Sequence, residues 1–357
     1  MKLVIVAGAR PNFMKIAPLM WELARRPRAA SYLVHTGQHY DEKMSKAFFD
    51  QLKIPRPDTD LEVGSGSHAV QTAEIMKRFE PVLTAQRPDV VVVVGDVNST
   101  IACAVTAVKL SIPVAHVEAG LRSFDRTMPE EINRLLTDAI SQWLFVSELS
   151  GVRNLNHEGV DSGRIFFVGN VMIDTLVACR ERFLRSEVLE EYAVKEKAYA
   201  VLTLHRPSNV DDPMVFRGLL RALNVIQKEI PVIFPVHPRT RTALMREPVD
   251  LPNLRLTEPL GYFEFMNLVA HARFVMTDSG GIQEETTFLG VPCLTLRNNT
   301  ERPVTTEIGT NLLVGLKPES IIEQARIAML AKPQGAPRIP ELWDGFASHR
   351  ILDVLLD

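Results

Sequence analysis

Short apolar runs alternate with longer segments of helical periodicity along almost the whole of this chain. The runs are nearly continuous in Val, Ile and Leu, which is typical of strands in a parallel sheet that is covered on both faces. This alternation predicts an α/β protein with doubly wound sheets. The longest run, VVVVV at residues 90–94, is far too short to cross a bilayer.

The strand-like runs form two series, separated by a charged stretch at residues 180–197. With 357 residues, the chain is long enough for two domains that each bury a core. We therefore predict two Rossmann-like domains, over residues 1–170 and 171–340, and a last helix over 341–357 that packs back on the first. The predicted strands are residues 3–7, 32–36, 90–95, 113–118, 143–147 and 165–169, then 198–206, 232–238, 254–259, 274–279 and 292–297.

Composition excludes several classes of protein. The net charge of −3 disfavours a general nucleic-acid-binding surface. The three cysteines are far apart in the sequence, which argues against a disulfide framework or a zinc site. Because the chain begins with the strand-like MKLVIVAG, we expect no signal peptide. We expect a soluble cytoplasmic protein with no bound metal and no membrane or nucleic-acid partner.

Residues 278–285, DSGGIQEE, stand where an apolar strand turns into a helix. Gly280 and Gly281 allow close approach to the backbone, and the first N–H groups of a helix suit a phosphate. Ser279 adds a hydroxyl donor, and Glu285, one turn later, suits a ribose diol. These features favour a nucleotide site over the simpler alternative, a tight turn with an N-cap serine.

Polar residues also gather where the other predicted strands end. In open α/β sheets, ligands bind beyond the carboxyl ends of the strands, so two sheets facing each other across a cleft would form an enzyme site. Neither half carries GxGxxG after a strand, so a dinucleotide cofactor is not indicated. The strand ends carry Gly8-Ala9-Arg10, Gly95-Asp96, His116 with Glu118, His205-Arg206, His237-Pro238 and Asp278-Ser279.

The basic residues at these ends suit a phosphorylated ligand. Arg10 and Lys15 begin a helix, and their fork and point charge are equally consistent with phosphate binding and with a solvated helix start. His205 with Arg206 fits a diphosphate better than it fits a core. Arg302 lies in a loop that reads either as a substrate lid or as a plain connection.

Three acidic positions are candidates for proton transfer. Asp96 could act as acid or base, although capping of the next helix is its simpler role. Glu118 follows apolar strand residues, and a carboxylate there requires a partner or a function. Glu130 and Glu131 lie in a first helical turn, where the helix dipole alone would favour them.

When these motifs are considered together, the chain resembles the non-hydrolysing UDP-N-acetylglucosamine 2-epimerases over nearly its whole length. The resemblance implies two Rossmann-like domains in the GT-B arrangement shared with nucleotide-sugar glycosyltransferases, a UDP-sugar substrate in the interdomain cleft, and a homodimer. The motifs that carry it are, in order, GARPNFMKIAP, HTGQHYD, GDVNST, HVEAGLRSFDRTMPEEINR, TLHRPSN, PVHPRTR, DSGGIQEE and TERP.

The resemblance also implies roles for individual residues. The UDP phosphates would be held at Ser279, Gly280 and Gly281, the ribose by Glu285, and the uracil ring by Phe265. The carboxylates of the reaction would be Asp96, Glu118 and Glu130, with the spacing leaving Glu131 open as an alternative. His205 would act with them, and the remaining basic residues of the UDP site would be Arg10, Lys15, His237 and Arg302.

The implied reaction needs such a set, because the C2 proton of the sugar is not acidic. UDP departs first, through an oxocarbenium-like transition state that cations and helix N–H groups stabilise. A carboxylate then removes the C2 proton, giving 2-acetamidoglucal and UDP. Reprotonation on the opposite face and re-addition of UDP yield the manno epimer, with no cofactor.

Several departures from the family pattern leave alternatives open. The sequences RPV (302–304) and HRPSN (205–209) allow a related substrate such as a diacetamido-uronate. QHYDEKMS (38–45) differs from relatives that UDP-N-acetylglucosamine activates allosterically. The competing classes are a GT-B glycosyltransferase, a non-catalytic nucleotide-sugar sensor, and a hydrolysing epimerase that releases free N-acetylmannosamine.

Overall fold

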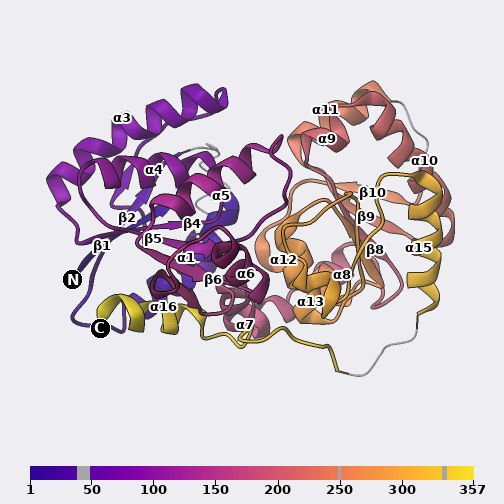
Figure 1. The fold of residues 1–357 in the computed structure, drawn as a ribbon. Coiled ribbons are helices and arrows are strands. Elements are labelled where there is room, and N and C mark those ends of the chain that lie inside the picture. Colours follow the sequence, from indigo (N-terminus) through magenta and orange to yellow (C-terminus); the bar gives the residue numbers. More distant parts are fainter. Residues whose placement is uncertain (38–48, 248–250, 332–335) are drawn as a thin grey trace. The chain divides into compact units, whose positions relative to one another are not determined.

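The computed structural model describes residues 1–37, 49–247, 251–331 and 336–357. The chain divides into two compact units, the first formed by Met1–Ala178 with Glu341–Asp357 and the second by Cys179–Pro340 (Figure 1). The division falls within helix α7 (Val171–Leu184). Each unit is built around a parallel sheet of its own.

The described part of the first unit contains a seven-stranded sheet in the order β3-β2-β1-β4-β5-β6-β7. The order reverses between β1 and β4, so the carboxyl ends of β1, β4 and β5 are neighbours at the switch point, where open α/β sheets bind ligands. The strands are β1 (Lys2–Ala7), β2 (Ala30–His35), β3 (Thr59–Asp60), β4 (Val90–Val94), β5 (Val114–Ala119), β6 (Trp143–Val146) and β7 (Ile165–Phe167).

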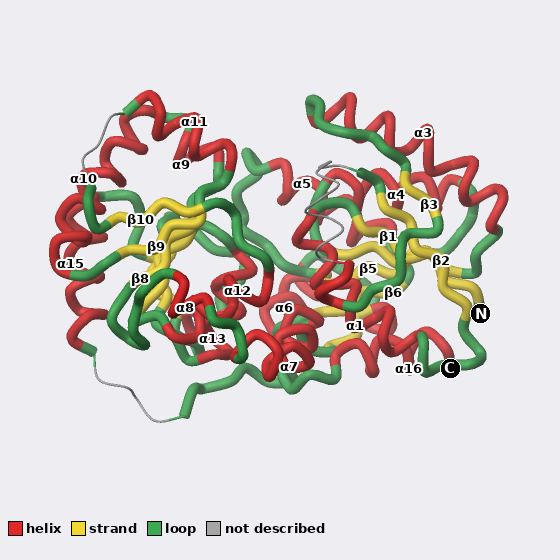
Figure 2. Tube along the Cα trace, turned by 180° about the vertical axis from the view of Figure 1, so that it is seen from behind, coloured by secondary structure: helices red, strands yellow, loops and turns green. Residues whose placement is uncertain are grey.

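Helices cover both faces of this sheet (Figure 2). On one face α3, α4 and α5 pack side by side, and on the other α1 packs against the last helix, α16. Their bounds are α1 (Arg10–Leu23), α3 (His68–Gln86), α4 (Asn98–Lys109), α5 (Pro129–Ile140), α6 (Leu149–His157) and α16 (Ala347–Leu356).

The described part of the second unit contains a six-stranded sheet in the order β10-β9-β8-β11-β12-β13. The neighbours β8 and β11 place residues 205 and 278 at adjacent strand ends. The strands are β8 (Ala200–Thr203), β9 (Val232–Pro235), β10 (Leu254–Thr257), β11 (Phe274–Thr277), β12 (Cys293–Thr295) and β13 (Asn311–Leu313). The helices are α8 (Val188–Glu191), α9 (Pro207–Val210), α10 (Pro213–Glu229), α11 (Pro238–Arg246), α12 (Tyr262–His271), α13 (Gly280–Leu289), α14 (Val304–Glu307) and α15 (Pro318–Leu330).

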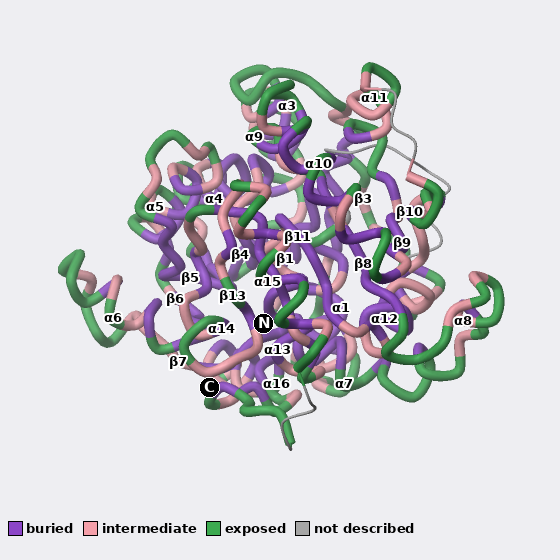
Figure 3. The backbone as a smooth tube through the Cα atoms, turned by 90° about the vertical axis from the view of Figure 1, so that its right-hand side faces the viewer, coloured by how far each residue is buried: buried purple, intermediate pink, exposed green. Residues whose placement is uncertain are grey.

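The strands form the buried centre of each unit (Figure 3). All five valines of β4 are buried, and two of them, Val91 and Val93, share a core cluster with Ile75 and Phe79 of α3. In the second unit, Phe216 of α10 and Phe234 of β9 share a core cluster. Removing one such buried aromatic ring costs about 3–5 kcal/mol.

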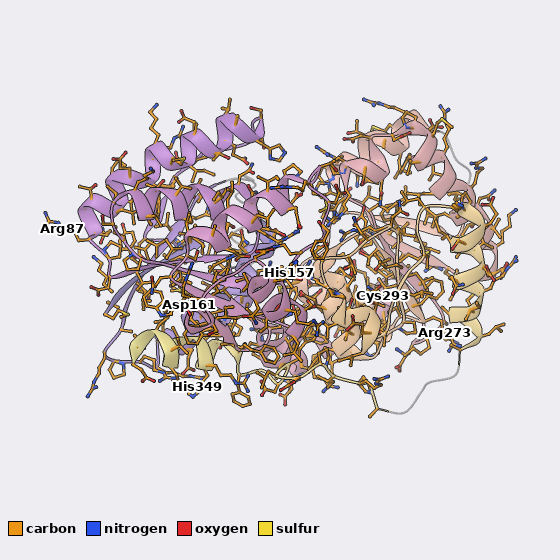
Figure 4. The ribbon with its side chains drawn as sticks, in the orientation of Figure 1. Arg87, His157, Asp161, Arg273, Cys293 and His349 are labelled. Carbon is orange, nitrogen blue, oxygen red and sulfur yellow. The ribbon has the colours of Figure 1, made fainter. Side chains whose placement is uncertain are left out.

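The predicted fold class, α/β with two doubly wound parallel sheets, is confirmed. The short edge strands β3 and β13 were not predicted, because neither carries the apolar run of the inner strands. Helix α16 is tied to α1 through His349 (Figure 4), whose Nδ1 lies 3.0 Å from Glu22. No helix within the described ranges is long and apolar enough to span a membrane.

Candidate active site

Glu118 is the most constrained carboxylate of the first unit. Its backbone has φ of +74°, a left-handed conformation that residues with a side chain adopt only when their surroundings impose it. The register between β5 and β6 shifts at this residue, and such bulges redirect a side chain. The residue is only 5% exposed. The Glu118 side chain is therefore oriented by a backbone conformation that is strained at this residue.

Lys15 of α1 is the partner of Glu118. Its Nζ lies 2.5 Å from the Glu118 carboxylate, and both side chains are buried. Gly95, with φ of +68°, leaves the space for this pair, because a Cβ there would lie 2.7 Å from the Lys15 Nζ. The resemblance placed Lys15 among the residues that bind the diphosphate. In the structure, Lys15 forms an ion pair with the buried Glu118.

Asp96 follows β4 and pairs with Arg134 of α5, whose guanidinium lies 3.1 Å from the carboxylate. The N-cap position of α4 is occupied by the next residue, Val97. Asn133 fixes the backbone of the same residue by donating to the Asp96 carbonyl at 2.9 Å. The Asp96 carboxylate is partly exposed and is held at the sheet edge that also carries Glu118.

Glu131 and Glu130 have different surroundings although they are adjacent on α5. Glu131 is buried, accepts hydrogen bonds from the backbone N–H groups of Ser123 and Phe124, both at 2.9 Å, and forms an ion pair with Arg134. Its carboxylate therefore has a structural role in holding the loop before α5. Glu130 is half-exposed, so its carboxylate is accessible to a ligand.

In the second unit, Asp278 organises the end of β8. It is fully buried and accepts the backbone N–H groups of His205 at 3.0 Å and Arg206 at 2.9 Å. Its Oδ1 lies 2.7 Å from Nδ1 of His205. Burial alone would raise the pKa of Asp278, but the charge of His205 and these hydrogen bonds outweigh it and lower the pKa. The ionised carboxylate thus orients the His205 ring, whose side chain is 45% exposed.

Ser279 is the N-cap of α13, as the simpler interpretation also required, but its side chain makes no capping hydrogen bond. Gly280 and Gly281 are the first helical residues. A Cβ on Gly280 would lie 2.8 Å from the Arg302 guanidinium carbon. Glycine at this position is therefore required by the protein itself, whereas the sequence suggested only close approach of a ligand.

Arg302 is buried beneath the start of α13. Its Nε lies 2.8 Å from the Glu284 carboxylate, and it also forms an ion pair with Glu301. Glu301 in turn lies 2.7 Å from Arg297. These contacts anchor the loop around Arg302 to the second unit, and they offset much of the positive charge that the sequence assigned to a diphosphate.

Glu285 lies in α13, one turn after the helix start, and is 3% exposed. Burial, together with the neighbouring Glu284 carboxylate, raises its pKa to about 8. The Tyr262 hydroxyl donates to its Oε1 at 3.3 Å. At neutral pH the protonated Glu285 can donate a hydrogen bond as well as accept one.

The structure places the other candidates as follows. Phe265 lies half-exposed on α12. His237 is exposed, caps α11 by accepting the Arg239 backbone N–H at 3.3 Å, and has its ring centroid 6.3 Å from that of His205. Arg10 begins α1, and its side chain lies outside the described part, as does the segment 38–45.

Each unit thus gathers one set of predicted residues. The first holds Lys15, Asp96, Glu118 and Glu130, and the second holds His205, His237, Ser279, Gly280, Gly281, Glu285 and Arg302. The sequence analysis assigned no role to Arg134, Asp278 or Glu284. One of these roles had a signal in the sequence: Glu131 and Arg134 are three residues apart, a spacing that makes them neighbours on one helix face and predicts an ion pair.

Comparison with known proteins decides the family. Residues 21–356 match the family model described as UDP-N-acetylglucosamine 2-epimerase. The chain belongs to this family. A protein named UDP-N-acetylglucosamine 2-epimerase homolog from Methanococcus maripaludis is 47% identical over 330 residues, which cover 90% of this chain and 91% of the relative. The predicted family and the predicted enzyme class, an isomerase, are confirmed.

Two further family members are similar over nearly the full length. The UDP-2,3-diacetamido-2,3-dideoxy-D-glucuronate 2-epimerase of Pseudomonas aeruginosa is 40% identical over 358 residues, covering 99% of each chain. The crystal structure of Methanocaldococcus jannaschii UDP-GlcNAc 2-epimerase in complex with UDP-GlcNAc and UDP superposes with a TM-score of 0.93 at 40% identity, covering 100% of this chain and 99% of that one.

A more distant likeness concerns the fold alone. The structure of Phytolacca americana UGT2 complexed with UDP-2fluoro-glucose and pterostilbene gives a TM-score of 0.60 at 11% identity, covering 99% of each chain. This agrees with the predicted GT-B class, to which each unit contributes one Rossmann-like sheet.

Proposed function

We propose that this protein interconverts UDP-N-acetylglucosamine and UDP-N-acetylmannosamine at C2 without net hydrolysis. The observation that carries the proposal is Glu118, a buried acid on a strained backbone that is paired with Lys15. A glycosyltransferase or a nucleotide-sugar sensor has no need of a strained acid at this position. The names of the family members, and the complex of the Methanocaldococcus jannaschii enzyme with UDP-GlcNAc and UDP, support the same substrate.

The first step breaks the bond between C1 and the diphosphate oxygen. The N-terminus of α13, with Ser279 at its N-cap, offers N–H donors to the departing UDP. His205, oriented through Nδ1 by Asp278, keeps its other ring nitrogen for the same diphosphate. Protonated Glu285 serves as a donor and acceptor for the ribose hydroxyls.

The second step removes the C2 proton. Glu118 takes it, leaving 2-acetamidoglucal and UDP, and Lys15 is the cation that lies beside the carboxylate. Return of a proton to the opposite face of C2 requires a second acid, for which Asp96 and Glu130 are the candidates. Re-addition of UDP to C1 then completes the epimerisation with atoms and charges balanced.

The test is an NMR experiment on the purified protein with UDP-N-acetylglucosamine in D2O. Deuterium at C2 of a mixture of UDP-linked gluco and manno sugars supports the proposal. Glu118→Gln should abolish this exchange, and Glu80→Gln, which changes an exposed glutamate of α3, should leave it unchanged. Free N-acetylmannosamine together with UDP would instead indicate the hydrolysing reaction.

A second substrate is favoured by one specific comparison, the 40% identity to the diacetamido-glucuronate 2-epimerase over 99% of both chains. The same carboxylates would act on C2 of that sugar. Parallel incubation with UDP-2,3-diacetamido-2,3-dideoxy-D-glucuronate distinguishes the two substrates. A kcat/KM at least about tenfold higher for this sugar, equivalent to about 1.4 kcal/mol, would transfer the assignment to it.

A further inference from the structure

His116 lies in β5, two residues before Glu118, and is completely buried. Its Nδ1 lies 2.6 Å from Oδ1 of Asp138, and its Nε2 lies 2.8 Å from the carbonyl oxygen of Gly95. A carbonyl and a carboxylate only accept hydrogen bonds. Both ring nitrogens therefore face hydrogen-bond acceptors, and the ring is held between two fixed partners.

Asp138 of α5 holds the other end of the same segment. Its Oδ2 accepts the backbone N–H of Gly120 at 3.1 Å and lies 2.7 Å from Arg122. Burial alone would raise the pKa of Asp138, but the charges of His116 and Arg122 outweigh it and lower the pKa. The ionised carboxylate thus ties together the residues on either side of Glu118.

Glu118 and Asp96, one of the two candidates for the second acid, both lie within two residues of a glycine that this pair holds. Gly95, just before Asp96, donates its N–H to the Val117 carbonyl at 3.0 Å and presents its own carbonyl to His116. Gly120 follows Glu118 by two residues. Gly95 and Gly120 both have positive φ, +68° and +79°, so each strand ends in a turn at a conformationally permissive residue.

We propose that His116 and Asp138 are a positioning pair, which fixes Asp96 and Glu118 relative to each other for proton transfer on the two faces of C2. The inference rests on the proposed function, in which Glu118 takes the C2 proton, and it assigns the return of a proton to Asp96, one of the two candidates there. Neither His116 nor Asp138 reaches the substrate in this role. The pair acts through the backbone, by clamping the ends of β4 and β5 together.

The expected effect of losing the pair is on the chemical step. A displacement of about 1 Å in a catalytic group lowers the rate by about 100-fold. The residues proposed to bind the UDP phosphates and ribose belong to the second unit and are unchanged, so KM should change little. Because proton transfer becomes slower, substrate deuterated at C2 should show a larger isotope effect on kcat than in the wild-type protein.

His116→Gln and Asp138→Asn test the pair in the full-length protein, with Glu158→Gln as the matched control. Glu158 lies at the far end of the same network, where it accepts from Arg122 at 2.7 and 2.8 Å, and neither hydrogen bond involves Gly95 or Gly120. We expect about a 100-fold loss of kcat in both pair variants, with a raised isotope effect and unchanged affinity for UDP, and near wild-type kcat in Glu158→Gln.

Three outcomes would overturn the inference. The first is a fall in kcat for Glu158→Gln as large as for the pair variants. The second is a loss of activity in the pair variants with no change in the isotope effect, which would mean only that a smaller fraction of the protein is folded. The third needs no variant: nitrogen NMR of the wild-type histidine rings that shows an unprotonated nitrogen on His116 would remove one of the two hydrogen bonds. A wild-type protein that exchanges no deuterium at C2 would instead refute the proposed function and the pair with it.

Discussion

Replacing Glu285 by glutamine should make the second unit more stable at alkaline pH. In the folded protein the Glu285 carboxyl has a pKa of about 8, against 4.5 in its ordinary state, because it is buried beside Glu284. Between these pH values the folded protein binds one proton more than the unfolded chain. Stability therefore falls as pH rises through this range, and the substitution Glu285→Gln removes that dependence.

The magnitude follows from the two pKa values. Each pKa unit by which the folded and unfolded states differ is worth about 1.4 kcal/mol. The range from 4.5 to about 8 thus corresponds to about 5 kcal/mol, contributed fully below pH 4.5 and lost by pH 8. That is a large fraction of the 5–15 kcal/mol that typically separates a folded domain from its unfolded state.

The assay is urea denaturation followed by far-UV circular dichroism at pH 5, 6, 7 and 8. All three tryptophans, Trp21, Trp143 and Trp343, belong to the first unit, so tryptophan fluorescence reports that unit and not the site of the substitution. The matched control is Glu323→Gln, on the exposed face of α15 in the second unit, which should leave the pH profile unchanged.

The expected result is a free-energy difference between Glu285→Gln and wild type that grows with pH. A difference that is the same at pH 5 and pH 8 would refute the reasoning, because it would mean that Glu285 ionises as readily in the fold as in the unfolded chain. Carbon NMR of labelled glutamate carboxyls, compared between the two proteins, would then locate the true titration of Glu285.

Three further predictions follow from the contacts of the site. Asp278→Asn should destabilise the protein by about 3 kcal/mol at pH 7. Because the pKa of Asp278 is lowered in the folded protein, this loss of stability should shrink as pH falls below about 4. Urea denaturation measures the loss, and an equal loss at pH 3 would contradict the prediction. Gly95→Ala should lower kcat by about 100-fold, because the added methyl group displaces Lys15 from Glu118. Gly159→Ala is the control, since Gly159 has a similar φ of +78° but open space around it, and it should change only stability, by about 1 kcal/mol. Equal activity of both variants in the epimerase assay would refute the steric argument. Glu131→Gln should lower the melting temperature, since Glu131 is hydrogen-bonded in the protein core. Glu130→Gln should instead lower kcat and leave the melting temperature unchanged. Calorimetry and steady-state kinetics measure the two effects, and the reversed pattern would mean that the two residues have exchanged roles.

The sequence by itself determined the features that depend on neighbouring residues. The apolar run of β4 required a buried strand, and the step from an apolar run to Ser279-Gly280-Gly281 required a helix start at a strand end. Periodicity and turn residues act over a few positions, so they can be read without the fold. The same rules found no strand at β3 or β13, where edge strands need no continuous apolar run.

Only the tertiary structure decided which charges meet. Lys15 and Glu118 are far apart in sequence and become partners because β1, β4 and β5 are neighbours in the sheet. The same strand order decides that Asp96 binds Arg134. Ion pairs depend on distance in space and on burial, and neither can be read from sequence separation. The sequence thus supplied the charged groups at the strand ends, and the order of the strands selected the partner of each one.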